Sequence, residues 1–381
     1  MAKVPPFIII RDTYANVVAN YSASADGALA YFTDLQCEGV KCNGAWYPSV
    51  LSSVDAVTGV SQLTTYGNKK ATPRNLAADG SFTTKRCPYL KTSTATNDAA
   101  GYTYQTIAAA EAPFNAVRIG FLNGESSAVT ISQCIAGVRG SVTTGAATWN
   151  NITFGGASSV TLPARLGTNR PSITYTDWLP LQSTPRNDGQ GTLPLFYIRA
   201  WIAAAQATFS QTSVADDLTW LASASSGALN SGRVWKTERQ NVNAVATPAN
   251  WTAPTQVTHA MPMIIEFAHS VRGITVLNVG DSIRLGTPSD SASTITKGDA
   301  FISAASLSTA SVPVSMVNAA WGGDNSANYT ARAVDMISAV QPDVVLFAPF
   351  TVNDGTPTDY RIAWEQGQLS QVFKAAKAAG A

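Results

Sequence analysis

The sequence predicts a mixed multidomain protein with a small β-rich N-terminal region, a β-sandwich, and a C-terminal α/β domain built on a doubly wound parallel sheet. Its 381 residues exceed what one ordinary core organises. Short strand-like stretches separated by turn residues come first, and strand and helix patterns alternate after Arg272. We divide the chain into an N-terminal segment 1–55, a linker or irregular region 56–100, a sandwich 101–270 and an α/β domain 271–381.

The composition argues against strongly charged partners. There are 25 Lys and Arg against 24 Asp and Glu, so no attraction to nucleic acid or to an anionic membrane is built in. No apolar run approaches the roughly 18 to 20 residues of a membrane span. Two prolines followed by Arg11 in the opening MAKVPPFIIIR do not fit a secretory leader. We expect no nucleic-acid binding, no membrane insertion and no signal peptide.

The four cysteines do not form a disulfide framework in so long a chain. Cys37 and Cys42 flank a predicted hairpin and are candidates to pair or to bind a metal, but no second Cys or His cluster stands nearby to complete a zinc site. The other two are Cys87 and Cys134. We expect reduced, partly buried thiols, no metal and no other cofactor.

Short strands are predicted in the first 50 residues, at 7–10, 28–32, 39–41 and 45–47. Asn43-Gly44 between the last two is a strong hairpin signal. A unit this small buries little apolar surface, so we expect it to depend on other copies or on a partner. Residues 51–100 are polar with few periodic apolar positions, which predicts a linker.

The phrase RDTYANVVANYSASADGALAYFTDLQ, closed by NGAWYPS, resembles the N-terminal segments of bacteriophage tail fibres, tailspikes and related virion proteins. The resemblance covers about the first 50 residues. It implies a place in the virion tail, contact with other virion tail proteins, and a homotrimer. The alternative is a β-hairpin cap with no viral role.

Alternating apolar residues predict the sandwich. Val117, Ile119 and Phe121 alternate with smaller or polar neighbours, and further strands are predicted at 195–201 and 263–267. The stretches FNAVRIGFLNGESSAVTIS and WNNITFGGASSVTLPARLGTNRPSITYTDW resemble the β-sandwich that precedes the nucleophile in a group of bacterial secreted esterases. This resemblance implies a wall for a substrate cleft, and the alternative is a rigid spacer.

Three buried strands are predicted after Arg272, at 274–279, 312–317 and 344–347, with helices between and after them. The buried face of the first helix is predicted as Ala327, Ala331, Val334, Ile337 and Val340. That of the second helix is predicted as Ile362, Leu369, Val372, Phe373 and Ala376. Each strand ends in a polar motif, and ligand sites in such sheets lie beyond the strand C-termini.

The three motifs supply the parts of an acyl-transfer site. Ser282, exposed by the turn after its strand, can attack a carbonyl if a base takes its proton. The backbone N–H groups of Ser282 and Gly323 and the side-chain amide of Asn353 are candidate donors to the oxyanion. Gly322 is an alternative to Gly323 as the donor. Each motif taken alone fits an ordinary turn equally well. The interpretation as a catalytic site therefore depends on the three motifs occurring in this order along the chain.

Gly280-Asp281-Ser282-Ile283, Gly323 within NAAWGGDNS, and Asn353-Asp354 within TVNDG resemble the first three conserved blocks of the SGNH (GDSL-type) hydrolases. The resemblance covers about 110 residues. It implies an esterase or deacetylase in which Ser282 is the nucleophile and Gly323 and Asn353 complete the oxyanion hole.

Two features depart from that family. Thr351 stands where glycine is usual, and the fourth block, Asp-x-x-His, is missing. The only histidines, His259 and His269, precede the nucleophile, and we expect neither to be the base. We expect the sequence to be the front of a longer protein, with an incomplete hydrolase domain and the base on the missing part.

These observations predict a phage tail fibre or tailspike protein that removes O-acyl groups, most simply O-acetyl groups, from host surface polysaccharide. It would act from the virion tail, outside the host cell. One rival is a structural or receptor-binding tail protein that keeps a hydrolase-like site without turnover. A second rival is a bacterial carbohydrate esterase with no virion role, which predicts a monomer.

Overall fold

The structure is a computed structural model. It describes residues 10–12, 19–20, 29–32, 37–42, 45–48, 82–87, 93–94, 100–140, 146, 148–185, 193–204, 209–210, 235–252, 255–256, 263–285, 307–309, 311–348, 350–355 and 359–381. The chain divides into two compact units, Met1–Arg74 and Asn75–Ala381. Within the described residues, no helix is both long and apolar enough to cross a membrane.

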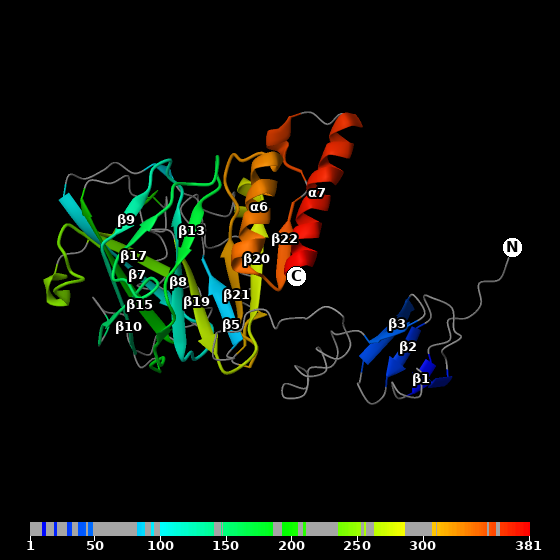
Figure 1. Cartoon of the computed structure of the whole chain (residues 1–381), viewed down its shortest axis with the longest axis horizontal. Helices are drawn as coiled ribbons and strands as arrows, with labels where there is room; N and C mark the ends of the chain where they lie inside the picture. Colours follow the sequence, from blue (N-terminus) through cyan, green and yellow to red (C-terminus); the bar gives the residue numbers. More distant parts are fainter. Residues whose placement is uncertain are drawn as a thin grey trace, which may run out of the picture. The chain divides into compact units, whose positions relative to one another are not determined.

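The first unit contains a four-stranded sheet, which forms the blue part of the chain in Figure 1. Its strands are β1 (Ile10–Asp12), β2 (Leu29–Phe32), β3 (Cys37–Cys42) and β4 (Ala45–Pro48). β1 pairs with β2 in parallel, and β2, β3 and β4 pair antiparallel in chain order. Cys42 pairs with Ala45 across a two-residue connection, which confirms the predicted hairpin.

Two antiparallel sheets form the larger part of the second unit. One has the strand order β11-β10-β15-β7-β17-β18, and the other has the order β13-β8-β19-β5 with β14 beside β8. Their bounds are β5 Phe82–Arg86, β7 Ala100–Ala109, β8 Ala116–Asn123, β10 Gln133–Arg139, β11 Asn150–Asn151, β13 Ser172–Tyr175, β14 Leu179–Pro180, β15 Leu195–Ala204, β17 Trp235–Gln240, β18 Thr255–Gln256 and β19 Met263–His269.

Shorter elements border these sheets. β6 (Ser93–Thr94) pairs with β16 (Phe209–Ser210), and β9 (Val129–Ile131) pairs with β12 (Val160–Leu162). A 3₁₀ turn, η2, spans Pro248–Asn250.

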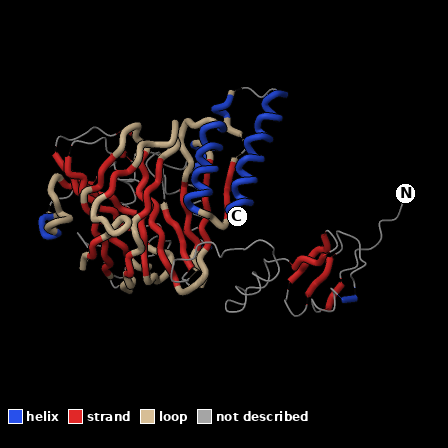
Figure 2. Tube along the Cα trace, viewed as in Figure 1, coloured by secondary structure: helices blue, strands red, loops and turns tan. Residues whose placement is uncertain are grey.

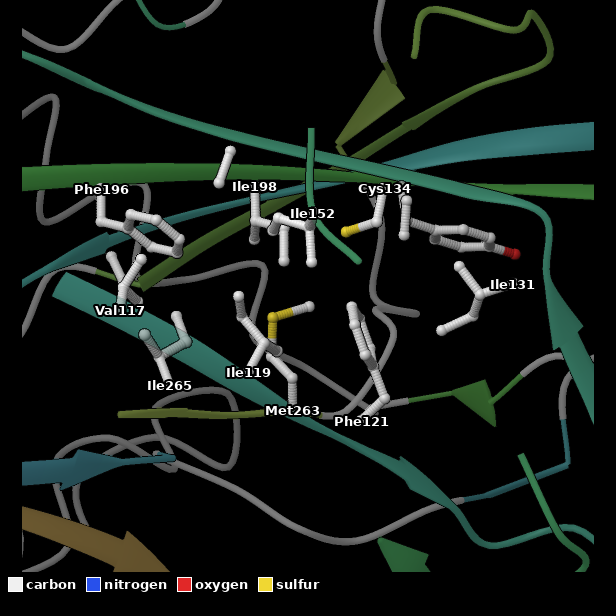
Figure 3. Packing of buried hydrophobic residues seen from close by; sticks show 14 of the residues in the cluster. Val117, Ile119, Phe121, Ile131, Cys134, Ile152, Phe196, Ile198, Met263 and Ile265 are labelled. Carbon is white, nitrogen blue, oxygen red and sulfur yellow. The ribbon is translucent and has the colours of Figure 1, made fainter. Parts of the chain in front are cut away.

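The sandwich core lies between the two sheets. Val117, Ile119 and Phe121 point from β8 toward Phe196 and Ile198 of β15, and all five are buried (Figure 3). Each side chain of this size contributes about 1.5 to 3 kcal/mol when it is buried. Their alternation in the sequence therefore identified the core face of β8 correctly.

The prediction of a doubly wound α/β domain is wrong. Strand is the most frequent secondary structure in the described chain (Figure 2), and the sheets are mostly antiparallel. Among the described strands of the second unit, only β20 (Ile274–Val279), β21 (Val314–Asn318) and β22 (Val344–Phe347) form a parallel sheet, in the order β21-β20-β22. The long helices α6 (Ser326–Val340) and α7 (Asp359–Ala379) join one hydrophobic cluster on a single face of it (Figure 1). A doubly wound sheet carries helices on both faces.

The physical reason for the difference lies at the edge of β21. Cys87, directly after β5, forms a parallel bridge with Val317. Its N–H donates to the Met316 carbonyl at 3.0 Å, and its carbonyl accepts from the Asn318 N–H at 2.8 Å. The parallel strands therefore extend the second sheet of the sandwich instead of forming a separate domain. β5, which makes this connection, lies within residues 56–100, where the sequence predicted a linker.

α6 covers the junction between the sandwich and the parallel strands. Its buried face lies against Leu277 and Val317 of the parallel sheet and against Leu122 and Ile264 of the sandwich. The predicted face was only partly correct, because Ala327 is exposed. The residues that α6 buries are Ser326, Tyr329, Thr330, Arg332, Ala333, Met336, Ile337 and Val340.

Candidate active site

Ser282 follows the end of β20. It is the first residue of the short helix α4 (Ser282–Leu285), and it is partly exposed. Gly280 makes the tight turn possible, because a Cβ at that position would lie 2.5 Å from Cγ and 2.8 Å from Cβ of Arg284. The sequence thus places a serine hydroxyl at the C-terminal end of the central parallel strand.

The segment after β21 lies beside this turn. The Ala319 N–H donates to the Asn278 carbonyl at 2.8 Å, and the Trp321 N–H donates to the Gly280 carbonyl at 3.0 Å. Gly323, further along the segment, is exposed and has φ +76°, a conformation that favours glycine. A Cβ there would meet no atom within 4 Å, so the backbone conformation and not space selects this glycine.

The segment after β22 contacts both of the others. The Thr351 hydroxyl donates to the buried carboxylate of Asp281, directly before Ser282. In the 3₁₀ turn η4 (Val352–Asp354), the side-chain amide of Asn353 donates to the Asp324 carbonyl at 2.8 Å. The three predicted motifs thus gather at one edge of the sheet, through hydrogen bonds made by Asn353 itself and by residues next to Ser282 and Gly323. The catalytic roles of these three residues stay predictions.

Asp354 fixes the third segment to the start of α6. Its carboxylate accepts from the Ser326 N–H at 2.9 Å and from the Thr351 N–H at 3.3 Å. Asn325 caps the same helix by accepting from the Asn328 N–H at 3.0 Å. These bonds satisfy N–H groups that a helix start otherwise leaves unpaired, so they also hold the segments in place.

A buried arginine that the sequence did not single out lies behind the site. Arg332 has no exposed surface, and it pairs with the carboxylate of Asp324. Its guanidinium also donates to the carbonyls of Ala319 at 2.8 Å and Gly280 at 3.4 Å. Burial lowers the pKa of Arg332, and the nearby Asp324 carboxylate opposes this shift. Arg332 lies three residues after Tyr329, on the same buried face of α6. This helical spacing was the sequence signal that could have identified it as buried.

Tyr329 is also fully buried on this helix. Its ring packs edge-on against Phe347 of β22, with centroids 5.6 Å apart. Burial raises the pKa of Tyr329, and the carboxylates of Asp354 and Asp281 raise it further. The hydroxyl therefore stays protonated and is not a general base at neutral pH.

His269 is at the wrong end of the sheet to serve as the base. It is fully buried, and its ring lies 2.8 Å from the Thr84 hydroxyl and 2.9 Å from the Pro113 carbonyl. Thr84 in turn lies against Gly273, before the start of β20. Six strand residues separate that end from the turn of Ser282, a distance of about 17 to 20 Å. His259 lies outside the described residues.

The described residues include no group of three or more His, Cys, Asp or Glu that could hold a metal ion. Cys37 and Cys42 are the two ends of the extended strand β3, so their Cα atoms lie about 17 Å apart and cannot be bridged to each other. Cys87 and Cys134 are buried, and burial raises the pKa of the Cys134 thiol.

Comparison with models of known protein families finds no match, and neither does a search of curated protein sequences.

Proposed function

We propose that the chain carries a serine-esterase site at the C-terminal ends of its parallel strands. Ser282 is the nucleophile, and the N–H groups of Ser282 and Gly323 and the amide of Asn353 are the oxyanion donors. The proposal rests on one observation above all. Hydrogen bonds from Thr351 to Asp281 and from Asn353 to the Asp324 carbonyl join three segments that are far apart in the chain.

The chemistry follows from these groups. The Ser282 oxygen forms a bond to the ester carbonyl carbon, and the carbonyl electron pair moves onto oxygen. The Ser282 hydroxyl proton passes through solvent to the oxygen of the alcohol that leaves. N–H donors aimed at this oxygen lower the barrier by about 3 to 4 kcal/mol each. Asn353 uses one amide hydrogen on the Asp324 carbonyl, and on this proposal the second donates to the oxyanion. Collapse then expels the alcohol and leaves an acyl-serine, which water hydrolyses.

We further propose that this site removes O-acetyl groups from host surface polysaccharide, as part of a phage tail fibre or tailspike in the virion tail. The support is the tail-like phrase in the first 50 residues together with the esterase-like motifs. On this proposal the protein assembles as a homotrimer and contacts other tail proteins.

A second candidate is a tail protein that binds acylated glycans without turnover. The observation that favours it is the position of His269, since the described residues place no histidine near Ser282. Without a base, a serine nucleophile loses most of its rate.

Acetate release from an O-acetylated polysaccharide tests the two candidates. The esterase proposal expects release by the unmodified protein, and a loss of at least about a hundredfold in Ser282→Ala. Ser158→Ala, at an exposed serine of the sandwich, is the control and should keep full activity. Equal release by the unmodified protein and Ser282→Ala would contradict the role of Ser282. Glycan binding without acetate release would favour the second candidate.

The tail proposal has its own test, which does not depend on activity. Light scattering after size-exclusion chromatography should give a trimer. A monomer would favour a bacterial esterase with no virion role.

A further inference from the structure

A loop of the sandwich reaches the segment that carries Gly323. The loop lies between β12 and β13, and Asn169 stands in it with φ +56°. The side-chain amide of Asn169 donates to the Asp324 carboxylate at 3.0 Å, and its carbonyl accepts from Arg332 at 3.2 Å. The left-handed backbone lets one residue face both partners at once.

Asp324 connects this loop to the candidate oxyanion donors. Its carboxylate, fully buried, is shared between Asn169 and Arg332. Its carbonyl receives the amide of Asn353, and its backbone N–H follows Gly323 directly. The orientation of the Gly323–Asp324 peptide and of Asn353 therefore depends on how firmly the Asp324 side chain is held.

We propose that Asn169, on the sandwich, is a positioning residue for the Gly323–Asp324 turn and, through it, for Asn353. Asn169 touches none of the reacting atoms. Its catalytic meaning rests on the proposed esterase site, whereas its effect on the turn does not. On this proposal the sandwich helps to position the site residues, in addition to any role as a spacer or as a wall of the substrate cleft.

The loop has a second attachment that keeps it docked when the Asn169 amide is removed. Arg170 donates two hydrogen bonds to the Asp335 carboxylate, at 2.7 and 3.0 Å. Inside the loop, the Leu166 N–H donates to the Arg170 carbonyl at 2.8 Å, and the Arg170 N–H donates to the Gly167 carbonyl at 3.1 Å.

The informative variant is Asn169→Gly. Glycine adopts φ +56° without strain and keeps the carbonyl that accepts from Arg332, so only the amide donor is lost. The matched control is Asn243→Gly, in the loop after β17. There the Asn243 amide donates to Gln133 at 3.1 Å and its side-chain oxygen accepts from the Ala246 N–H at 2.9 Å, away from Ser282.

Two measurements read the effect. Hydrogen exchange followed by mass spectrometry should show faster exchange in the peptide spanning 319–328 for Asn169→Gly and not for Asn243→Gly. Covalent labelling of Ser282 by a fluorophosphonate probe should show a maximal rate about ten- to a hundredfold lower for Asn169→Gly, with half-saturating probe concentration little changed. Asn243→Gly should label like the unmodified protein.

Unchanged exchange at 319–328 in Asn169→Gly would overturn the inference. Faster exchange with an unchanged labelling rate would also overturn it, because the contact would then hold the loop without affecting the site. If the unmodified protein is not labelled, or Ser282→Ala is labelled equally, the proposed esterase function fails instead. Exchange alone then decides whether Asn169 positions the turn.

Discussion

The Thr351 hydroxyl donates a hydrogen bond to the Asp281 carboxylate, 70 residues earlier in the chain. Both residues are buried, and each stands close to a candidate catalytic group, Asp281 before Ser282 and Thr351 before Asn353. Position 351 is where the resemblance of the sequence to the SGNH hydrolases predicted a glycine. In this chain the Thr351 side chain links the turn before Ser282 to the segment after β22.

Thr351→Val should test this connection, because valine keeps the shape of threonine and removes the donor. Weakening the hydrogen bonding of a buried carboxylate should lower the free energy of unfolding by about 1 to 3 kcal/mol. Probe labelling of Ser282 should slow as well. Urea unfolding gives the first value. Thr161→Val, which removes an exposed hydroxyl 3.0 Å from that of Thr130, should change stability by less than about 0.5 kcal/mol. Equal effects of the two substitutions would contradict the prediction.

Arg332→Met should be among the most destabilising substitutions. It leaves the Asp324 carboxylate buried without its cation and removes donors to the Ala319 and Gly280 carbonyls. Breaking a buried ion pair costs about 3 to 5 kcal/mol. Arg170→Met removes a partly exposed pair with Asp335 and should cost at most about 1 kcal/mol. Urea unfolding of both variants measures the difference, and similar losses would show that Arg332 is not the central support.

The sequence predicted the strands better than it predicted which sheets they join. The alternation of Val117, Ile119 and Phe121 depends on neighbours in the chain, so it identified a core face. The three parallel strands were also anticipated. Their attachment to the sandwich depends on Cys87 pairing with Val317, and nothing local signals a contact between residues so far apart in the chain.

The helices show a related limit. The predicted faces followed the apolar residues alone, yet α6 also buries Tyr329, which packs against Phe347, and Arg332, which pairs with Asp324. On α7, Leu369 and Phe373 were predicted to be buried but are 45% and 68% exposed, while Val372 is buried as predicted. Apolar periodicity identifies a helix more reliably than it identifies the side that is covered.

The residues of the candidate site also fall into those that local sequence indicated and those that only the structure reveals. Ser282, Gly323 and Asn353 were predicted as site residues because each follows a strand and has a side chain or backbone suited to one task, and their segments do meet at one edge of the sheet. Asn169 and Arg332 were missed, since the contacts of Asn169 with Asp324 and with Arg332 span 155 and 163 residues.

His269 should make stability depend on pH. Burial lowers the pKa of His269 below its usual value of 6.5. Just below pH 6.5 the histidine is therefore protonated in the unfolded chain but still neutral in the folded protein. The contribution of His269 to stability is therefore complete above pH 6.5 and is lost as pH falls below it toward the folded pKa. His269→Gln should flatten the rise of unfolding free energy between about pH 5 and 7, measured by urea unfolding. An unchanged slope would mean that His269 already titrates normally.

Gly323→Ala should separate backbone strain from function. Gly323 and Gly155 both have positive φ, +76° and +59°, and a Cβ at either would meet no atom within 4 Å. Alanine at either position should therefore cost a similar amount, about 1 to 2 kcal/mol, because only the left-handed backbone is disfavoured. Gly155 lies in a sandwich turn, where its N–H donates to Asp177 at 2.9 Å. If the Gly323 N–H is an oxyanion donor, only Gly323→Ala should also slow the labelling of Ser282. Comparing the labelling rates of the two alanine variants, which should lose similar stability, isolates that effect. Equal labelling rates would show that the backbone conformation at Gly323 does not control the reaction of Ser282.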